Sequence, residues 1–131
     1  MIEWDDKFSV LNDEIDEQHK KLILIIEKVA TIVSQKNFEL SKVLEVVDEL
    51  DNYVDEHFSS EEALMVKYDY PYMDFQLKEH DKLRKKLEEL NVFNHENDPK
   101  FFNEMLHYLI DWLLDHILKT DKKLGLYIKS L

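Results

Sequence analysis

Residues 13–35 read DEIDEQHKKLILIIEKVATIVSQ, and the spacing of the apolar side chains in this stretch decides the fold class. Asn12 or Asp13 can cap its start, because a side-chain oxygen there can accept a free backbone N–H. Apolar residues recur at intervals of three, four and seven positions, which places them on one face of an α-helix. They are Ile15, Leu22, Ile23, Ile26, Val29 and Val33. The stretch therefore predicts an amphipathic helix with one buried face.

Three further segments, at about 40–68, 73–92 and 100–120, repeat this helical spacing. Little interrupts them, since the chain has one Gly and two Pro. A length of 131 residues suits one hydrophobic core, so we expect a single domain over residues 1–131. Four long amphipathic helices with short connections predict an all-α fold, an up-down-up-down four-helix bundle.

The connections between these helices carry their own signals. The residue before a proline avoids the helical region, so Tyr70 and Pro71 end the second helix. Residues 93–97 are polar and read as a loop. Asp98 followed by Pro99 supplies an N-cap and a first helical residue for the fourth helix.

Both ends of the chain are expected to lie against the bundle. Residues 1–11 predict an extended N-terminal arm, and a short helical tail should follow residue 120, with Gly125 as its weak point. The arm offers four side chains for packing: Trp4, Phe8, Val10 and Leu11.

The charge and composition exclude several classes of protein. The net charge is −12 and the sole arginine is Arg84, so nucleic acid and anionic membrane surfaces are unsuitable partners. There is no cysteine, which excludes disulfides, thiolate metal sites and iron–sulfur clusters. The start of the chain does not read as a signal peptide, and the longest aliphatic run, Leu22 to Ile26, is too short for membrane insertion. We expect a cytoplasmic monomer.

Polar residues on the apolar faces are the informative exceptions. Glu61 lies four residues after His57, and Gln76 lies four before His80, so each pair shares a helix face. One inward histidine is usually an ordinary core residue, but here every helix has one. They are His19, His57, His80 and His116. A buried carboxylate is unfavourable unless it is paired, protonated or metal-bound, so a cation at the bundle centre would explain Glu61 and the histidines together.

The sequence spacing leaves Asp121 undecided. It lies five residues after His116, off the same face of a regular helix. It could swing inward at a frayed or tightened helix end, or it could cap the tail. The other two histidines are expected not to bind metal, because His107 has polar neighbours and His95 lies in the polar loop.

The candidate donors favour two metal ions. Imidazole suits iron, zinc, copper and nickel, whereas mixed nitrogen and oxygen donors argue against calcium and magnesium. The donors are too many for one tetrahedral zinc. Two six-coordinate ions bridged by carboxylates would use the whole set: His19, His57, Glu61, Gln76, His80, His116 and Asp121.

Several motifs follow one another along the chain. They are Trp4-Asp5, Ile15-Asp16-Glu17-Gln18-His19, His57-Phe58-Ser59-Ser60-Glu61-Glu62, Tyr70-Pro71, Glu79-His80-Asp81-Lys82-Leu83 and Trp112-Leu113-Leu114-Asp115-His116-Ile117, followed by Asp121. With these motifs the chain resembles the hemerythrin family, and specifically the single-domain bacterial hemerythrins, over nearly its whole length.

This resemblance implies a cofactor and a role for each matching residue. It implies two iron ions joined by an oxygen bridge, with Glu61 and Asp121 bridging them, and so favours Asp121 as a ligand. It also implies the histidines of each iron: His19 and His57 on the iron open to dioxygen, and His80 and His116 on the other.

The chain departs from the family pattern at one ligand position. The family has His-x-x-x-His there, whereas this chain reads Gln76-Leu77-Lys78-Glu79-His80. An amide oxygen is a neutral and weaker donor for iron than imidazole. Three outcomes are open: Gln76 binds iron through its oxygen, holds a water or other ligand at an open position, or leaves the second iron weakly bound. A substitution introduced by engineering would look the same.

The primary functional prediction is reversible binding of dioxygen, as in an oxygen carrier, store or sensor. The alternative is a di-iron enzyme acting on peroxide, dioxygen or nitric oxide, which an open position near Gln76 would favour. A third hypothesis is a non-catalytic sensor, iron store or structural bundle. The expected partner in the first two readings is dioxygen or another small diatomic molecule or peroxide.

Overall fold

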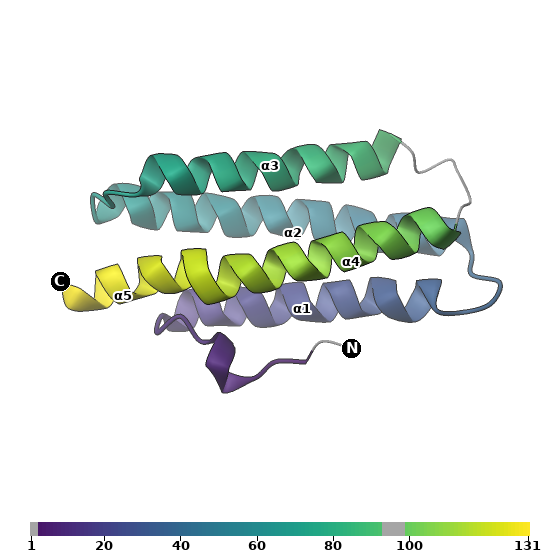
Figure 1. The fold of residues 1–131 in the computed structure, drawn as a ribbon, viewed down its shortest axis with the longest axis horizontal. Helices are drawn as coiled ribbons and strands as arrows, with labels where there is room; N and C mark the ends of the chain where they lie inside the picture. Colours follow the sequence, from purple (N-terminus) through teal and green to yellow (C-terminus); the bar gives the residue numbers. More distant parts are fainter. Residues whose placement is uncertain (1–2, 93–98) are drawn as a thin grey trace.

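The computed structural model describes residues 3–92 and 99–131. Within these residues four long helices lie side by side, each antiparallel to the next along the chain (Figure 1): α1 (Asp13–Val33), α2 (Leu40–Lys67), α3 (Met73–Val92) and α4 (Pro99–Asp115). Helix α1 packs against α2 and α4, and α2 packs against α3. The predicted up-down-up-down four-helix bundle is confirmed.

Two shorter elements continue the fourth helix. The π-helical segment η2 (His116–Asp121) follows α4 directly, and α5 (Lys122–Ser130) follows η2, so that the three form one long rod in Figure 1. The predicted helical tail is therefore present. No helix in the described residues combines the length and the apolar character that crossing a membrane requires.

The observed helix ends agree closely with the sequence signals. Asn12, rather than Asp13, caps α1, because its Oδ1 accepts the backbone N–H of Ile15 at 3.1 Å. Helix α2 ends one residue before Tyr68. Helix α4 begins at Pro99, whereas the predicted loop 93–97 and its N-cap Asp98 lie outside the described residues.

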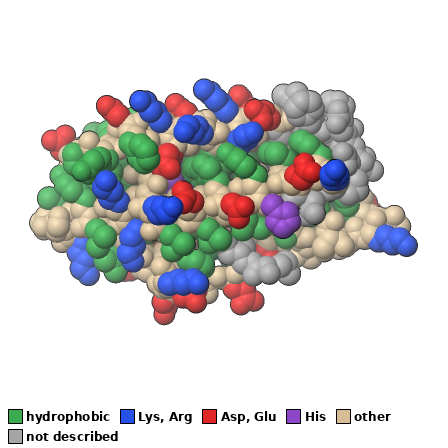
Figure 2. Space-filling view, viewed as in Figure 1, with side chains coloured by type: hydrophobic (Ala, Val, Ile, Leu, Met, Phe, Trp, Pro, Cys, Tyr) green, Lys and Arg blue, Asp and Glu red, His purple; other side chains and the backbone are tan. Residues whose placement is uncertain are grey.

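The hydrophobic core runs along the inside of the bundle. Its buried side chains come from all four helices and from the tail, and include Ile15, Leu22, Leu50, Phe58, Leu87, Leu113 and Leu124. A smaller cluster of Phe38, Val43 and Val47 closes the end near the α1–α2 connection. On the face seen in Figure 2, acidic and basic side chains alternate over the described helices, with hydrophobic side chains between them.

The N-terminal arm lies across the outside of the bundle and contains a short 3-10 turn, η1 (Asp6–Phe8) (Figure 1). Phe8 and Val10 are buried, as predicted, and the Trp4 ring packs against Phe8 at the core edge. The prediction for Leu11 is wrong, since its side chain is 45% exposed. The backbone of Leu11 adopts a φ of 62°, which turns the chain into α1 and directs this side chain to solvent.

Gly125 lies where the tail meets the arm. A Cβ at this position would lie only 1.7 Å from the backbone oxygen of Val10, so no larger residue fits without moving the arm. Lys122 strengthens the same contact by donating to the Ser9 carbonyl oxygen at 2.9 Å. Helix α5 continues through Gly125 without a break. The expected weak point is therefore a site of close backbone packing.

Candidate metal centre

The structure brings all seven candidate donors together inside the bundle. Helix α1 contributes one histidine, α2 a histidine and a glutamate, α3 a glutamine and a histidine, and η2 its first and last residues. Each side chain is at most 1% exposed. They are His19, His57, Glu61, Gln76, His80, His116 and Asp121. The sequence pattern thus locates the buried polar centre of the molecule.

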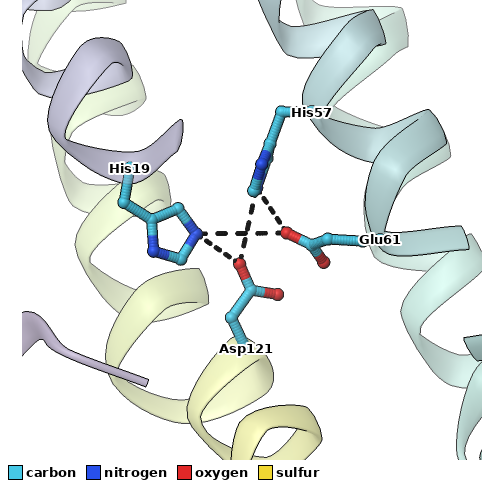
Figure 3. Close-up of side chains that lie close together, drawn as sticks. All are labelled: His19, His57, Glu61 and Asp121. Carbon is cyan, nitrogen blue, oxygen red and sulfur yellow. Dashed lines mark hydrogen bonds and ion pairs between the residues drawn. The ribbon is translucent and has the colours of Figure 1, made fainter. Parts of the chain in front are cut away.

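Four of these side chains form what we call the first group: His19, His57, Glu61 and Asp121 (Figure 3). His19 Nε2 lies 2.7 Å from Asp121 Oδ2 and 4.0 Å from Glu61 Oε1. His57 Nε2 contacts Glu61 Oε1 and lies 3.6 Å from Asp121 Oδ2. Figure 3 shows two imidazoles and two carboxylates converging on one point from three helical segments.

A second group shares Glu61 with the first and adds His80 and His116. His80 Nε2 lies 3.5 Å from Glu61 Oε2. His116 Nε2 lies 2.9 Å from Asp121 Oδ1 and 3.7 Å from Glu61 Oε1. The two groups are therefore neighbours, with both carboxylates between them.

Gln76 adjoins the second group through its amide nitrogen. Gln76 Nε2 donates to Glu61 Oε2 at 2.5 Å and to Asp121 Oδ1 at 2.9 Å. The amide thus links the two carboxylates on the side away from His19 and His57. Its oxygen, Oε1, is buried and accepts no hydrogen bond in the described structure.

The π-helical geometry of η2 positions Asp121. In a π-helix the hydrogen bonds join residues five apart, so a side chain five positions on returns to nearly the same face. His116 and Asp121 are the two ends of this segment, and both point into the centre. Of the two positions that the spacing left open, Asp121 takes the inward one, through a widened turn rather than a frayed or tightened one. The alternative role as a cap fails, since the Asp121 side chain makes no capping hydrogen bond to α5.

Unpartnered polar atoms concentrate in this centre. Among the described residues, seven buried side-chain atoms make no hydrogen bond, although some contact a carboxylate. They are His19 Nδ1, His57 Nε2, Glu61 Oε1, Gln76 Oε1, His80 Nε2, and Nδ1 and Nε2 of His116. Such atoms are rare in folded proteins, and every one here belongs to a candidate donor. The lone pairs of imidazole nitrogen and carboxylate oxygen suit a metal ion.

Mutual attraction sets the charge states of these side chains. Burial lowers the pKa of His57, but the Glu61 and Asp121 carboxylates outweigh burial and raise that pKa to about 9. Burial also opposes the charged form of His116, and Asp121 with Glu61 raises its pKa to about 10. The imidazoles in turn hold the pKa of Glu61 well below its ordinary value and lower the pKa of Asp121, against the effect of burial. A metal ion would displace these protons, because imidazole binds metal in its neutral form.

Side chains outside the centre contact the rear nitrogens of three imidazoles. Gln18 Oε1 lies 2.7 Å from His57 Nδ1, and Gln18 Nε2 donates to Ser60 Oγ at 3.0 Å. Glu62 Oε1 lies 3.5 Å from His80 Nδ1, and Glu79 Oε2 lies 4.0 Å from His116 Nδ1. Sequence reasoning missed these partners. The available signal was adjacency, because Gln18, Glu62 and Glu79 each directly precede or follow a buried donor.

Aromatic rings cover two of the imidazoles. Phe58 stacks on His80 with ring centroids 3.7 Å apart, and Trp112 stacks on His116 at 4.5 Å. Trp112 packs at the core edge while also contacting His116. These stacks fix the ring planes of the second group. Of the two histidines expected not to bind metal, His107 is exposed and His95 lies outside the described residues.

An apolar cavity adjoins the centre beside His57 and His116. Its volume, counted as the positions that the midpoint of a water-sized sphere can take, is about 20 Å³, which is enough for one small molecule. Its walls are otherwise hydrophobic and include Leu22, Ile26, Leu50, Leu109 and Leu113. A small apolar molecule could therefore lie next to the imidazoles without polar competition for the space.

Comparison with known proteins places this arrangement among related chains. The family model described as "Hemerythrin HHE cation binding domain" matches residues 10–127. The bacteriohemerythrin of Clostridium acetobutylicum is 31% identical over 94% of this chain and 98% of its own length. A bacteriohemerythrin of Campylobacter jejuni is 32% identical over 93% and 91%. A crystal structure of wild-type hemerythrin superimposes with a TM-score of 0.85 at 29% identity, covering 95% of each chain.

Proposed function

The chain belongs to the hemerythrin family, and on this premise we propose that it reversibly binds dioxygen at a non-haem site of two iron ions bridged by carboxylates. The observation that carries the proposal is the division of the buried donors into two groups that share Glu61. Glu61 and Asp121 each turn one oxygen towards either group, as a bridging carboxylate must.

The donors present fit iron. Four imidazoles and two carboxylates form a mixed nitrogen and oxygen set without sulfur, which suits iron in either of its common oxidation states. In the proposal His19 and His57 bind one ion, His80 and His116 bind the other, and Glu61 and Asp121 bind both. Bound iron would supply the reversible electron transfer that uptake of dioxygen requires.

The protein around the donors performs the tasks that a metal cannot. Gln18 orients the His57 ring, and the stacked Phe58 and Trp112 rings orient His80 and His116. The apolar cavity beside His57 and His116 offers dioxygen a space that water does not favour. Excluding water also protects the site from irreversible oxidation.

Metal analysis combined with an optical spectrum tests this proposal directly. The purified chain should carry about two irons, and its reduced form should change spectrum when dioxygen is added and recover when dioxygen is removed. A spectral change that cannot be reversed would contradict oxygen carriage. Bound zinc, or a chain that folds and binds no metal, would contradict the di-iron site itself.

A di-iron enzyme acting on peroxide, dioxygen or nitric oxide is the second candidate, and Gln76 is the observation that favours it. On the side of the second group, the Gln76 amide nitrogen faces both carboxylates, and an NH₂ group cannot bind a metal ion. An ion held there would have room for a substrate. Mixing the iron-loaded protein with peroxide and an electron donor distinguishes the two functions, since an oxygen carrier shows no turnover.

A further inference from the structure

The Gln76 amide holds the two carboxylate oxygens that face the second group. Its nitrogen donates to Glu61 Oε2 at 2.5 Å and to Asp121 Oδ1 at 2.9 Å. The opposite oxygens, Glu61 Oε1 and Asp121 Oδ2, face the first group and meet only imidazole nitrogens. The two sides of the carboxylate pair therefore differ in what a metal ion must displace.

Electrostatics determines which end of the amide faces the carboxylates. An amide oxygen in this position would be repelled by two anions, whereas the NH₂ group gives each anion a charge-assisted hydrogen bond. A cation in the second group reverses this requirement, because the NH₂ group cannot coordinate it and the amide oxygen can. Gln76 Oε1 is buried without a partner in the present orientation. The oxygen can face a metal ion only after the amide has turned over.

The first group has no such obstacle. His19 Nε2 and His57 Nε2 already face oxygens of both shared carboxylates, with no amide between them. On the side of the second group, the Gln76 amide bonds to one oxygen of each carboxylate. Metal binding in the first group therefore requires no rearrangement of an amide.

We propose that Gln76 orders metal binding, so that one ion binds first among His19, His57, Glu61 and Asp121 while the amide still bridges the carboxylates. The second ion binds with His80 and His116 only when the Gln76 side chain turns. The chain thus has a defined one-metal form. This inference rests on the proposed two-metal function and specifies the order in which its sites fill.

Cobalt(II) titration of the chelator-treated protein, followed by optical spectra and native mass spectrometry, tests this order. We expect the two stepwise dissociation constants to differ by about a hundredfold, within the range by which residues that contact metal ligands change metal affinity. At one equivalent of cobalt, that ratio corresponds by mass action to about four fifths of the chains holding one ion. The His80→Ala variant should keep the first step, and the His19→Ala variant should lose it.

Replacing the amide separates its effect from simple repulsion between two cations. Gln76→His supplies an imidazole and removes the donor, so the two constants should approach each other by about tenfold or more. Gln76→Glu keeps the shape of the side chain while removing the NH₂ group, and should narrow the gap as well. Gln35→His adds an imidazole at an exposed position and should leave the titration unchanged. Circular dichroism checks that each variant is folded.

The possible failures are distinguishable. An equal gap in the wild type, Gln76→His and Gln76→Glu would overturn the role of Gln76 and leave the two-metal proposal intact. A first ion that survives His19→Ala and is lost in His80→Ala would overturn the order. Failure of the folded wild-type chain to bind any cobalt or iron would overturn the order and the proposed function together.

Discussion

The first and second groups of the metal centre differ in what lies behind their imidazoles. In the first group, the neutral Gln18 amide oxygen lies 2.7 Å from the rear nitrogen of His57. In the second, the acidic Glu62 and Glu79 side chains lie 3.5 Å and 4.0 Å from the rear nitrogens of His80 and His116. The group that has a glutamine in place of a histidine is thus the group with carboxylates behind its rings.

In the proposed di-iron site, this difference means that metal affinity depends on an inner layer of donors and on an outer layer of residues behind them. A carboxylate hydrogen-bonded to the rear nitrogen of an imidazole fixes the ring and makes it a better donor. Glu62 is within hydrogen-bonding distance of His80 Nδ1, whereas Glu79 is too far from His116 Nδ1 for a hydrogen bond and acts through its charge. Arg84 and Thr120 hold Glu62 and Glu79 in place, at 3.4 Å and 2.6 Å respectively. In the proposed site, the Glu62 and Glu79 carboxylates would therefore offset part of the affinity lost by having glutamine at position 76.

Removing the shared carboxylate should weaken metal binding in both groups and give the largest effect. Glu61→Ala deletes a donor from both groups, so we expect bound iron to fall from about two per chain to well below one, a loss of at least 100-fold in affinity. Metal analysis after dialysis measures this. Glu56→Ala, on the exposed side of α2, is the control. Retention of two tightly bound ions in Glu61→Ala would show that the groups do not depend on this residue.

Neutralising the outer carboxylates should widen the difference between the groups. Glu79→Gln removes the charge near His116, and we expect affinity for the second ion to fall by about tenfold while the first changes little. Gln18→Leu should weaken binding of the first ion and change the second little, because it removes the partner of His57. The stepwise cobalt titration reports both. Equal effects of both variants on both steps would mean that the outer residues act only on the fold.

The pH dependence of the chelator-treated protein should separate His57 from His116. Their pKa values are raised to about 9 and about 10, from an ordinary value of 6.5. The stabilising ion pairs are therefore complete below pH 6.5 and are lost as the pH rises through about 9 in the first group and about 10 in the second.

We expect the free energy of unfolding in urea to fall between pH 6.5 and pH 10, and imidazole NMR signals to titrate in the order His57, then His116. His107→Gln is the control, because His107 is exposed and its replacement should leave the pH dependence of the unfolding free energy unchanged. A free energy of unfolding that stays constant or rises over this interval would contradict the ion pairs.

Loosening an outer carboxylate should give the smallest effect. Thr120→Val removes the hydroxyl that donates to Glu79 at 2.6 Å and nearly preserves side-chain volume. We expect a loss of about 1 kcal/mol in unfolding free energy, typical of one hydrogen bond, and a few-fold weaker second metal step. Thermal unfolding and cobalt titration check these values. A larger effect on the first metal-binding step would mean that Glu79 supports the first group and not the second.

The inward histidines could be predicted from sequence because the period of an α-helix is fixed. Once the apolar stripe of a helix is known, His19, His57 and His80 must lie on it, and the structure places them there. Glu61 follows from His57 by the same spacing. The four-helix bundle follows from the lengths of these stripes and from the positions of the breaks between them.

Features that depend on a departure from regular geometry could not be predicted in this way. The position of Asp121 depends on a π-helical segment, and no residue type in that segment predicts this geometry. The exposure of Leu11 depends on one left-handed backbone angle. The orientation of Gln76 depends on two carboxylates that reach it from other elements. The first two features are local departures from regular backbone geometry, and the third requires the relative placement of helices. The period of a regular helix contains neither kind of information.

The widened turn between His116 and Asp121 makes the backbone conformation there as important as the identity of the residues. An interval of five keeps His116 and Asp121 on one face only while the segment stays π-helical. If the same residues wound as regular α-helix, Asp121 would lie about 140° from His116 around the helix axis, because each residue turns an α-helix by about 100°. Asp121 would then leave the centre, and Gly125 would turn away from Val10, although no residue had been replaced. A change of backbone conformation in this one turn therefore acts on the metal centre and on the contact between tail and arm at once.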